Sequence, residues 1–152
     1  MNTIRVSKAF DFEMSHALWN YDGACRNIHG HSYKLQVTLC GKPEVDENDP
    51  KSGMVLDFAM LKKIVKGPVV DHLDHALVLN EKAKDLIPGS DHQMFEKIHF
   101  VDFQPTCENL VLYIVNLIKP LLPLDIRLHS LRLYETATSF AEWYASDNPE
   151  VE

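Results

Sequence analysis

Three of the eight histidines of this 152-residue chain stand where two strands could bring their side chains together. His29 and His31 are two positions apart in an alternating apolar and polar segment, so both point to one face of a strand. His16 holds an apolar position in an earlier alternating segment, and antiparallel pairing would place it beside His29. Three imidazoles with a fourth position open are the ligand set of a catalytic zinc ion. Strand-capping or surface histidines are the competing interpretation, and spacing alone does not decide.

Cys25 is the candidate general base nearest to these histidines. It lies four residues before His29, in a segment with Gly23 that is typical of a loop. A thiolate whose pKa is lowered by a neighbouring cation can abstract a proton from a bound substrate. A lone cysteine is more often a small buried apolar residue, which is the interpretation for Cys40 and Cys107. The cysteines are odd in number and form no C-x-x-C pair, which indicates reduced thiols.

Carboxylates and further histidines follow later in the chain. The segment Asp71-His72-Leu73-Asp74-His75 contains two adjacent Asp-His pairs. A neighbouring carboxylate fixes the tautomer of an imidazole and raises its basicity, so either pair could transfer protons. Glu135 ends a late strand, where a glutamate is usually solvated surface. Thr106 and Glu108 open a helix, where a hydroxyl caps and an acid favours the helix dipole.

Alternating patterns predict the strands that position these residues. Period-2 alternation predicts strands over Ile4–His16 and His29–Leu39. Two closing strands are expected over Arg127–Glu135 and Ser139–Tyr144.

Two helices are predicted between these strands. Asp57 is expected to cap a short helix. Pro105 and Thr106 open a longer one, in which apolar residues recur every three to four positions as far as Leu121. Residues 79–104 show weak periodicity and are expected to be mostly loop. These elements predict an α+β domain, an antiparallel sheet with two helices on one face.

The composition narrows the class of protein. The length suits one domain that spans residues 1–152. The formal net charge of -7 argues against a general nucleic-acid surface. No apolar run approaches the roughly 18 residues that cross a bilayer, and the N-terminus lacks the apolar segment of a signal peptide. A cytoplasmic protein with neither a membrane nor a nucleic acid as partner is therefore expected.

Six segments resemble, in order, the signatures of the 6-pyruvoyl/6-carboxytetrahydropterin synthase family. They are FDFEMSHAL around His16, CRNIHGHSYKL from Cys25 to Leu35, GMVLDF from Gly53 to Phe58, LDHALVLN from Leu73 to Asn80, PTCENL from Pro105 to Leu110, and LYET from Leu133 to Thr136. They cover most of the chain, and six matches in order are far more specific than one. By this resemblance His16, His29 and His31 bind zinc, and Cys25 abstracts a proton.

The same resemblance assigns the remaining site residues. The family's L-D-H signature falls on Asp74 and His75, which implies a second proton-transfer role, with His72 solvent-facing or structural. Glu135 matches the glutamate that anchors the pterin ring, where one carboxylate accepts two N–H bonds and can also join the proton relay. Thr106 is expected to line the pterin pocket.

The resemblance also implies the substrate, the fold and the assembly. The substrate is the small molecule 7,8-dihydroneopterin triphosphate, the cofactor is Zn²⁺, and the fold is the T-fold, a four-stranded antiparallel sheet with two helices. The family joins sheets into trimers and trimers into hexamers, with active sites between subunits, so a homo-oligomer is expected. Arg26 and Lys34 are candidates for the triphosphate site. Residues 81–104 match no signature of the family.

Branches of the family differ in their product. One eliminates triphosphate and yields 6-pyruvoyltetrahydropterin, whereas another also releases acetaldehyde and leaves 6-carboxytetrahydropterin, a precursor of queuosine. The three-residue gap between Cys25 and His29 resembles the carboxy branch, so that product is predicted and the pyruvoyl product is the alternative. A third branch carries glutamate near the cysteine position, against which Cys25 counts. The alternative of another class is a non-catalytic, zinc-stabilised pterin-binding protein, which needs no proton-transfer residues.

Overall fold

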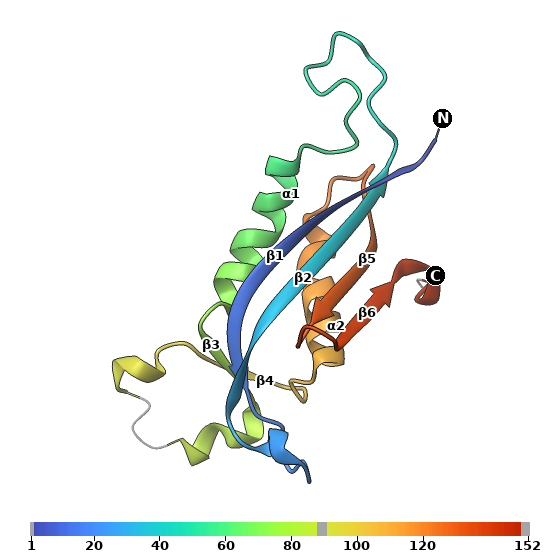
Figure 1. Ribbon diagram of the computed structural model, residues 1–152. Coiled ribbons are helices and arrows are strands. Elements are labelled where there is room, and N and C mark those ends of the chain that lie inside the picture. Colours follow the sequence, from blue (N-terminus) through green and yellow to red (C-terminus); the bar gives the residue numbers. More distant parts are fainter. Residues whose placement is uncertain (1, 88–90, 150–152) are drawn as a thin grey trace.

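A long antiparallel hairpin forms the centre of the computed structural model, which describes residues 2–87 and 91–149 (Figure 1). It consists of β1 (Ile4–His16) and β2 (His29–Gly41). The register pairs His16 with His29 at one end and Ile4 with Gly41 at the other. Buried and exposed residues alternate along most of both strands, as the period-2 pattern requires. Both predicted strands are confirmed, and β2 extends two residues beyond the expected end.

The two closing strands extend the hairpin on the β2 side. β5 (Arg127–Tyr134) pairs antiparallel with β2, and β6 (Phe140–Tyr144) pairs antiparallel with β5. Both strands begin and end within one residue of the predicted bounds. The four antiparallel strands expected from the sequence are therefore present.

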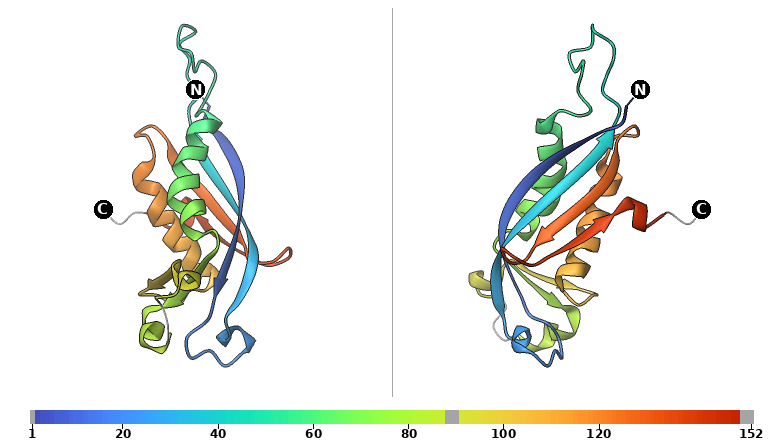
Figure 2. Two further views of the ribbon diagram at one scale, coloured as in Figure 1. Left: turned by 90° about the vertical axis from the view of Figure 1, so that its left-hand side faces the viewer. Right: turned by 45° about the vertical axis from the view of Figure 1, so that its right-hand side comes forward.

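Both helices lie on the same face of the sheet (Figure 2). α1 (Phe58–Val65) begins after Asp57, whose side chain accepts a hydrogen bond from the Ala59 N–H. α2 (Cys107–Ile118) begins after Thr106, whose hydroxyl accepts one from the Asn109 N–H. These are the capping bonds expected at helix N-termini. A π-helical segment (Lys66–Asp71) continues α1 and leads to the second pair of Asp and His residues.

The sheet has six strands in the order β4-β3-β1-β2-β5-β6, so the expectation of a four-stranded antiparallel sheet is wrong. β3 (Ala76–Asn80) runs parallel to β1, and β4 (Ile98–Val101) runs parallel to β3. The expectation that residues 79–104 are mostly loop left out β4 and the end of β3, and the start of β3 before residue 79 was not predicted either. β3 is buried almost throughout and therefore shows no alternation, and β4 has only four residues. Short 3₁₀ turns, Glu81–Leu86 and Gln93–Phe95, lie between them.

The hydrophobic core fills the space between the sheet and the two helices. Each fully buried Leu, Ile or Phe side chain contributes about 1.5–3 kcal/mol relative to an exposed one. The residues that form it from the central hairpin and the helices include Phe10, Phe12, Met14, Leu35, Val37, Leu39, Leu61, Val65, Leu110, Ile114 and Ile118. His16 and Tyr33 are buried on the same face of the hairpin, so the core extends to the histidines. Across residues 2–87 and 91–149, no helix has the length and apolar character needed to cross a membrane.

Candidate metal centre and active site

The three predicted histidines converge at the end of the β1–β2 hairpin. Their ligand nitrogens lie within 4.8 Å of one another, and the Nε2 atoms of His16 and His29 are 3.1 Å apart. Zinc–nitrogen bonds of about 2.0–2.1 Å at tetrahedral angles would separate two ligand atoms by about 3.3 Å. Among the described residues, His16, His29 and His31 form the only such group of three. Their positions fit one metal ion per chain.

Backbone carbonyls fix the tautomers of two of these rings. His16 Nδ1 lies 2.7 Å from the Pro105 carbonyl oxygen, and His29 Nδ1 lies 2.7 Å from that of Asn27. A carbonyl oxygen only accepts, so each Nδ1 carries the proton, and each Nε2 of a neutral ring presents a lone pair. Two lone pairs that face each other at 3.1 Å repel, whereas a cation bound by both would make the arrangement favourable.

The third histidine has a buried nitrogen without a partner. His31 Nε2 is inaccessible to solvent and makes no hydrogen bond among the described residues. Leaving such an atom unsatisfied costs about 1–3 kcal/mol. The Glu135 Oε1 atom lies 3.7 Å away, which is too far for a hydrogen bond. A metal ion held by the three rings would provide the missing partner, so the residues present fit a bound metal.

Burial keeps His16 in the form that binds metals. The residue is 2% exposed, and desolvation lowers its pKa below the ordinary 6.5, although the hydrogen bond to Pro105 opposes the shift. Neutral imidazole is the ligand form, because the metal must replace the proton.

A cavity of about 400 Å³ opens beside the histidines. It is lined by Cys25 from the β1–β2 loop, Thr106 at the start of α2 and Glu135 at the end of β5, with His16 in its wall. Glu135 is 24% exposed rather than fully solvated, and its backbone N–H donates to the Ser139 carbonyl at 3.0 Å in the β5–β6 turn. Four residues predicted to do chemistry therefore share one cavity.

Tyr33 is a buried residue with a polar hydroxyl on the histidine face of β2, and the sequence analysis assigned it no role. It is 1% exposed, its ring stacks on Phe12 at a centroid distance of 5.3 Å, and it meets His31 edge-on. Its hydroxyl has no hydrogen-bond partner among the described residues. Burial, together with the charge of Glu135, raises the pKa of Tyr33. The H-G-H-x-Y spacing places Tyr33 on the histidine face and was the available sequence signal.

The Asp74–His75 pair exists as predicted but does not share this cavity. His75 Nδ1 lies 3.0 Å from Asp74 Oδ2. The Glu13 N–H donates to Asp74 Oδ1 at 2.9 Å, and this bond lowers the pKa of Asp74. The exposed His75 lines a separate hollow that also contains the candidate metal ligand His31, together with Glu13 and Ser32, whose side chains lie on the face of the hairpin opposite the core. One chain alone therefore does not bring this pair to Cys25.

The two basic residues suggested for the triphosphate also lie outside the cavity. Arg26 is exposed and lines a different hollow, together with Trp19 and Leu86. Lys34 is exposed on the polar side of β2. The structure does not bring Arg26 and Lys34 together with Glu135.

His72 was expected to be either solvent-facing or structural, and its contacts are those of a structural residue. Its Nε2 lies 2.9 Å from the Tyr113 hydroxyl, and its ring stacks on His99 at a centroid distance of 4.2 Å. The His99 Nε2 lies 2.8 Å from the His72 carbonyl oxygen. Burial, followed by the charges of His99 and Lys97, lowers the pKa of His72.

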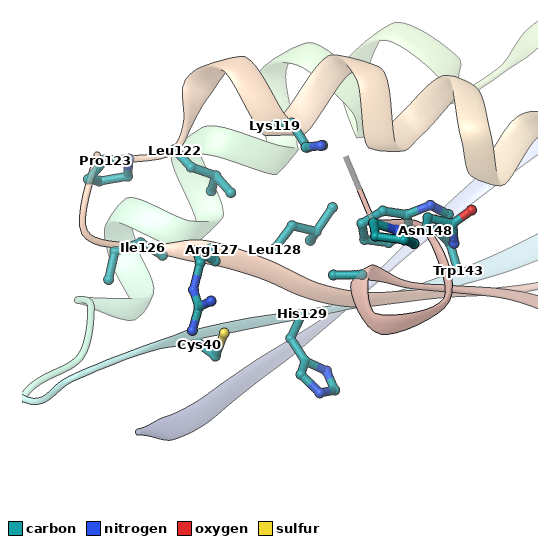
Figure 3. A pocket seen from close by; sticks show the side chains of 12 residues that line it. Cys40, Lys119, Leu122, Pro123, Ile126, Arg127, Leu128, His129, Trp143 and Asn148 are labelled. Atoms are coloured by element: carbon teal, nitrogen blue, oxygen red, sulfur yellow. The ribbon is translucent and has the colours of Figure 1, made fainter. Parts of the chain in front are cut away.

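A separate cavity of about 500 Å³ lies beside β5 and the end of β6 (Figure 3). Its lining includes Cys40, Lys119, Arg127 and Trp143 and contains none of the residues predicted to bind metal or move protons. Cys40 is 8% exposed, in keeping with the packing role expected for it.

Comparison with known proteins places the whole domain in one family. Residues 5–146 match the family model described as 6-pyruvoyl tetrahydropterin synthase. The chain is 38% identical to 6-carboxy-5,6,7,8-tetrahydropterin synthase of Haemophilus influenzae, over 91% of this chain and 97% of that protein. It is 32% identical to 6-pyruvoyl tetrahydrobiopterin synthase of Pongo abelii, over 87% and 85% of the two chains.

The solved structure of Caenorhabditis elegans 6-pyruvoyl tetrahydropterin synthase has a similar fold. Its TM-score against this chain is 0.66 at 25% identity, and the match covers 95% of this chain and 96% of that one. The similarity extends over both the hairpin that carries the histidines and the elements around it.

Proposed function

The chain belongs to the 6-pyruvoyl tetrahydropterin synthase family of enzymes, and from this premise we propose that it is a 6-carboxy-5,6,7,8-tetrahydropterin synthase. It converts 7,8-dihydroneopterin triphosphate to 6-carboxytetrahydropterin, acetaldehyde and triphosphate, on the route to queuosine. The observation that carries the proposal is the convergence of three histidines beside a cavity that contains Cys25 and Glu135, in a chain 38% identical to such a synthase.

The side chains in the cavity suggest a division of roles. Three neutral nitrogen ligands with a fourth position open favour zinc. When bound, zinc supplies Lewis-acid polarisation of the oxygens on the substrate side chain. Cys25 takes a carbon-bound proton as general base. Glu135 accepts two N–H bonds from the 2-amino-4-oxo edge of the pterin ring, and Thr106 lines the same cavity.

The position of Asp74 and His75 supports an active site between subunits. These residues take the second proton-transfer role in the proposal, yet they lie on the opposite face from Cys25. A second copy of the chain that presents its own Asp74–His75 pair to this cavity would complete the site. The proposed assembly is therefore a homo-oligomer, a trimer or a hexamer of two trimers.

Open strand edges supply a means of assembly. β1 pairs with β3 only over Met14–His16, so its earlier residues have no partner on that edge among the described strands. β6 is the last strand of the sheet, and among the described strands it pairs only with β5. Unpaired edges present free N–H and C=O groups that another strand can satisfy. Joining β1 of one copy to β6 of the next would extend the sheet around a ring.

Mixing two inactive variants tests the shared site. Cys25→Ala and His75→Ala each remove one half of the proposed machinery. If a site combines Cys25 of one copy with His75 of another, subunit exchange between the variants restores part of the activity. Sedimentation of the mixture checks that oligomers form. Mixed oligomers without any recovery would show that each site uses residues of one chain.

The product distinguishes the proposal from its alternatives. Pure protein with zinc is incubated with 7,8-dihydroneopterin triphosphate, volatile aldehyde is trapped, and the pterin is weighed by mass spectrometry. Acetaldehyde and 6-carboxytetrahydropterin in equal amounts support the proposal. Stoichiometric 6-pyruvoyltetrahydropterin without acetaldehyde would assign the chain to the pyruvoyl branch, to which the 32% identity with the Pongo abelii protein lends support. Binding without turnover would favour a pterin-binding protein.

Two further expectations belong to this proposal. One continuous core cluster draws on residues from Phe10 to Trp143, which supports a single domain. Cys25, Cys40 and Cys107 form no disulfide, which suits the reducing cytoplasm.

A further inference from the structure

The Gln104 side chain joins two segments that carry residues of the site. Its Oε1 accepts the Trp19 N–H at 2.8 Å, and its Nε2 donates to the Trp19 carbonyl at 2.8 Å. One side-chain amide therefore satisfies both main-chain groups of one residue, in the way a neighbouring strand would. Both bonds are partly buried, so water competes with them less than at an open surface.

Trp19 adjoins the residue that is bonded to Cys25. The Leu18 N–H donates to the Cys25 carbonyl at 2.9 Å and closes the loop between β1 and β2. The remaining backbone hydrogen bonds of this loop, residues 17–28, stay within it. Over residues 2–87 and 91–149, the two bonds of Gln104 are the only ones that tie the loop to a segment beyond its flanking strands.

Gln104 is itself held firmly. Its carbonyl accepts the Thr106 N–H at 2.8 Å and the Asn109 Nδ2 at 2.9 Å, which fixes its backbone to the start of α2. The next residue, Pro105, accepts the proton of His16 Nδ1. The same three residues, 104–106, therefore anchor the loop, orient a metal ligand and cap a helix.

We propose that Gln104 is a positioning residue for Cys25. Its two-point bond to Trp19 holds the loop so that the thiol stays in the cavity wall beside His16 and Glu135. The inference rests on the proposed function, in which Cys25 is the base. A loop with few external bonds opens locally at low cost, and a displacement of about 1 Å in a catalytic group can lower the rate about 100-fold.

Two substitutions of Gln104 and one control test this role. Gln104→Met keeps the length of the side chain and removes both bonds, whereas Gln104→Glu keeps the acceptor for the Trp19 N–H and loses the donor. Gln93→Met changes an exposed glutamine in the turn before β4 and serves as the control. Each protein is assayed for zinc content, thermal unfolding, kcat and KM. The alkylation rate of Cys25 by iodoacetamide is followed by peptide mass spectrometry, with Cys40, which lies outside the cavity, as internal reference.

The expected result separates positioning from general damage. In Gln104→Met, kcat falls about 100-fold with little change in KM, Cys25 is alkylated faster, and zinc content and Cys40 alkylation stay at wild-type values. Gln104→Glu lies between Gln104→Met and the wild type, and Gln93→Met matches the wild type. Should Gln104→Met fail to fold, Gln104→Glu carries the test.

Two results would overturn the inference. One is wild-type kcat and wild-type Cys25 alkylation in a folded Gln104 variant. The other is an equal rise in the alkylation of Cys25 and Cys40 with loss of zinc, since that is a general structural defect. If the wild-type protein turns over no pterin, the proposed function fails, and selective alkylation of Cys25 still decides whether Gln104 positions it.

Discussion

The two groups of histidines in this protein use one side chain in opposite ways. In the first, His16 and His29 each donate a hydrogen bond from Nδ1 to a backbone carbonyl. Their unprotonated Nε2 atoms face each other 3.1 Å apart. In the second, His72 and His99 stack, and their Nε2 atoms bond to a tyrosine hydroxyl and a backbone carbonyl. The placement of fixed hydrogen-bond partners therefore separates the two groups. In the first group the partners occupy Nδ1 and leave the Nε2 atoms of His16 and His29 facing each other, an arrangement that could hold a metal ion.

Loss of metal is the largest effect this comparison predicts. His29→Ala and His31→Ala each remove one of three ligands, so we expect metal affinity to fall by more than about 100-fold and activity with it, because even partners outside the ligand set are worth about 10- to 100-fold. His99→Ala, in the stacked group, should keep its metal. Metal analysis after gel filtration checks all three proteins. If His29→Ala and His31→Ala both kept a full complement of metal, the proposed distinction between the two groups of histidines would be wrong.

Proton transfer should be separable from metal binding. Cys25→Ala should keep zinc and fold but lose activity by about 100-fold or more, because a positioned base contributes about that factor. Cys40→Ala is the matched control, since Cys40 lies away from the cavity. If zinc leaves together with activity, Cys25 is a fourth ligand, and the three histidines alone do not define the metal site.

A substitution of Lys97 alters the surroundings of His72 and His99 and leaves the three metal-site histidines unchanged. The Lys97 ammonium donates to the Asp71 carbonyl at 2.7 Å and also to the Asp74 carbonyl. Lys97→Met should lower the free energy of unfolding by about 1 kcal/mol, because it leaves the partly buried Asp74 carbonyl without this donor, whereas water can replace the exposed bond to Asp71. Lys62→Met, on the exposed side of α1, should change it little. Urea denaturation measures both, and loss of zinc in Lys97→Met would show that the two groups are coupled.

The sequence predicted those parts of the fold whose pattern repeats along the chain. β1 and β2 have 13 residues each and alternate along most of their length, which encodes both the strands and the face that carries the histidines. β3 is apolar almost throughout, and β4 has four residues, so neither contains a period to detect. β3 depends on tertiary pairing with β1, and β4 depends on pairing with β3, which no local pattern reveals.

The site shows the same limit. The resemblance predicted the histidines, Cys25 and Glu135, and the structure places His16, Cys25 and Glu135 in the lining of one cavity, with His29 and His31 next to His16. The sequence could not reveal that Asp74 and His75 reach the other face, because that depends on where the chain crosses from the helical layer into the sheet. Arg26 and Lys34 were proposed from charge alone, and charge carries no information about direction.

The smallest predicted effect concerns the pH dependence of stability, and it arises in the second group. Burial and the neighbouring His99 and Lys97 lower the pKa of His72 below the ordinary 6.5. In the unfolded chain His72 takes up a proton as the pH falls through about 6.5, whereas the folded protein resists protonation. The unfolded state then binds more protons, so the contribution of His72 to stability is complete above this pH and declines below it.

His72→Gln removes this titration and keeps a polar group to meet the Tyr113 hydroxyl, which lies 2.9 Å from His72 Nε2. We expect the free energy of unfolding to fall less steeply in the variant than in the wild type between about pH 7 and pH 5. Both proteins are unfolded with urea at saturating zinc, so that the pH dependence of metal binding at His16, His29 and His31 is common to both and cancels in the difference. Equal slopes would mean that His72 does not resist protonation in the folded protein. A steeper slope in the variant would mean that His72 is charged in the folded protein. Either outcome would contradict the view that burial and the neighbouring charges keep His72 neutral.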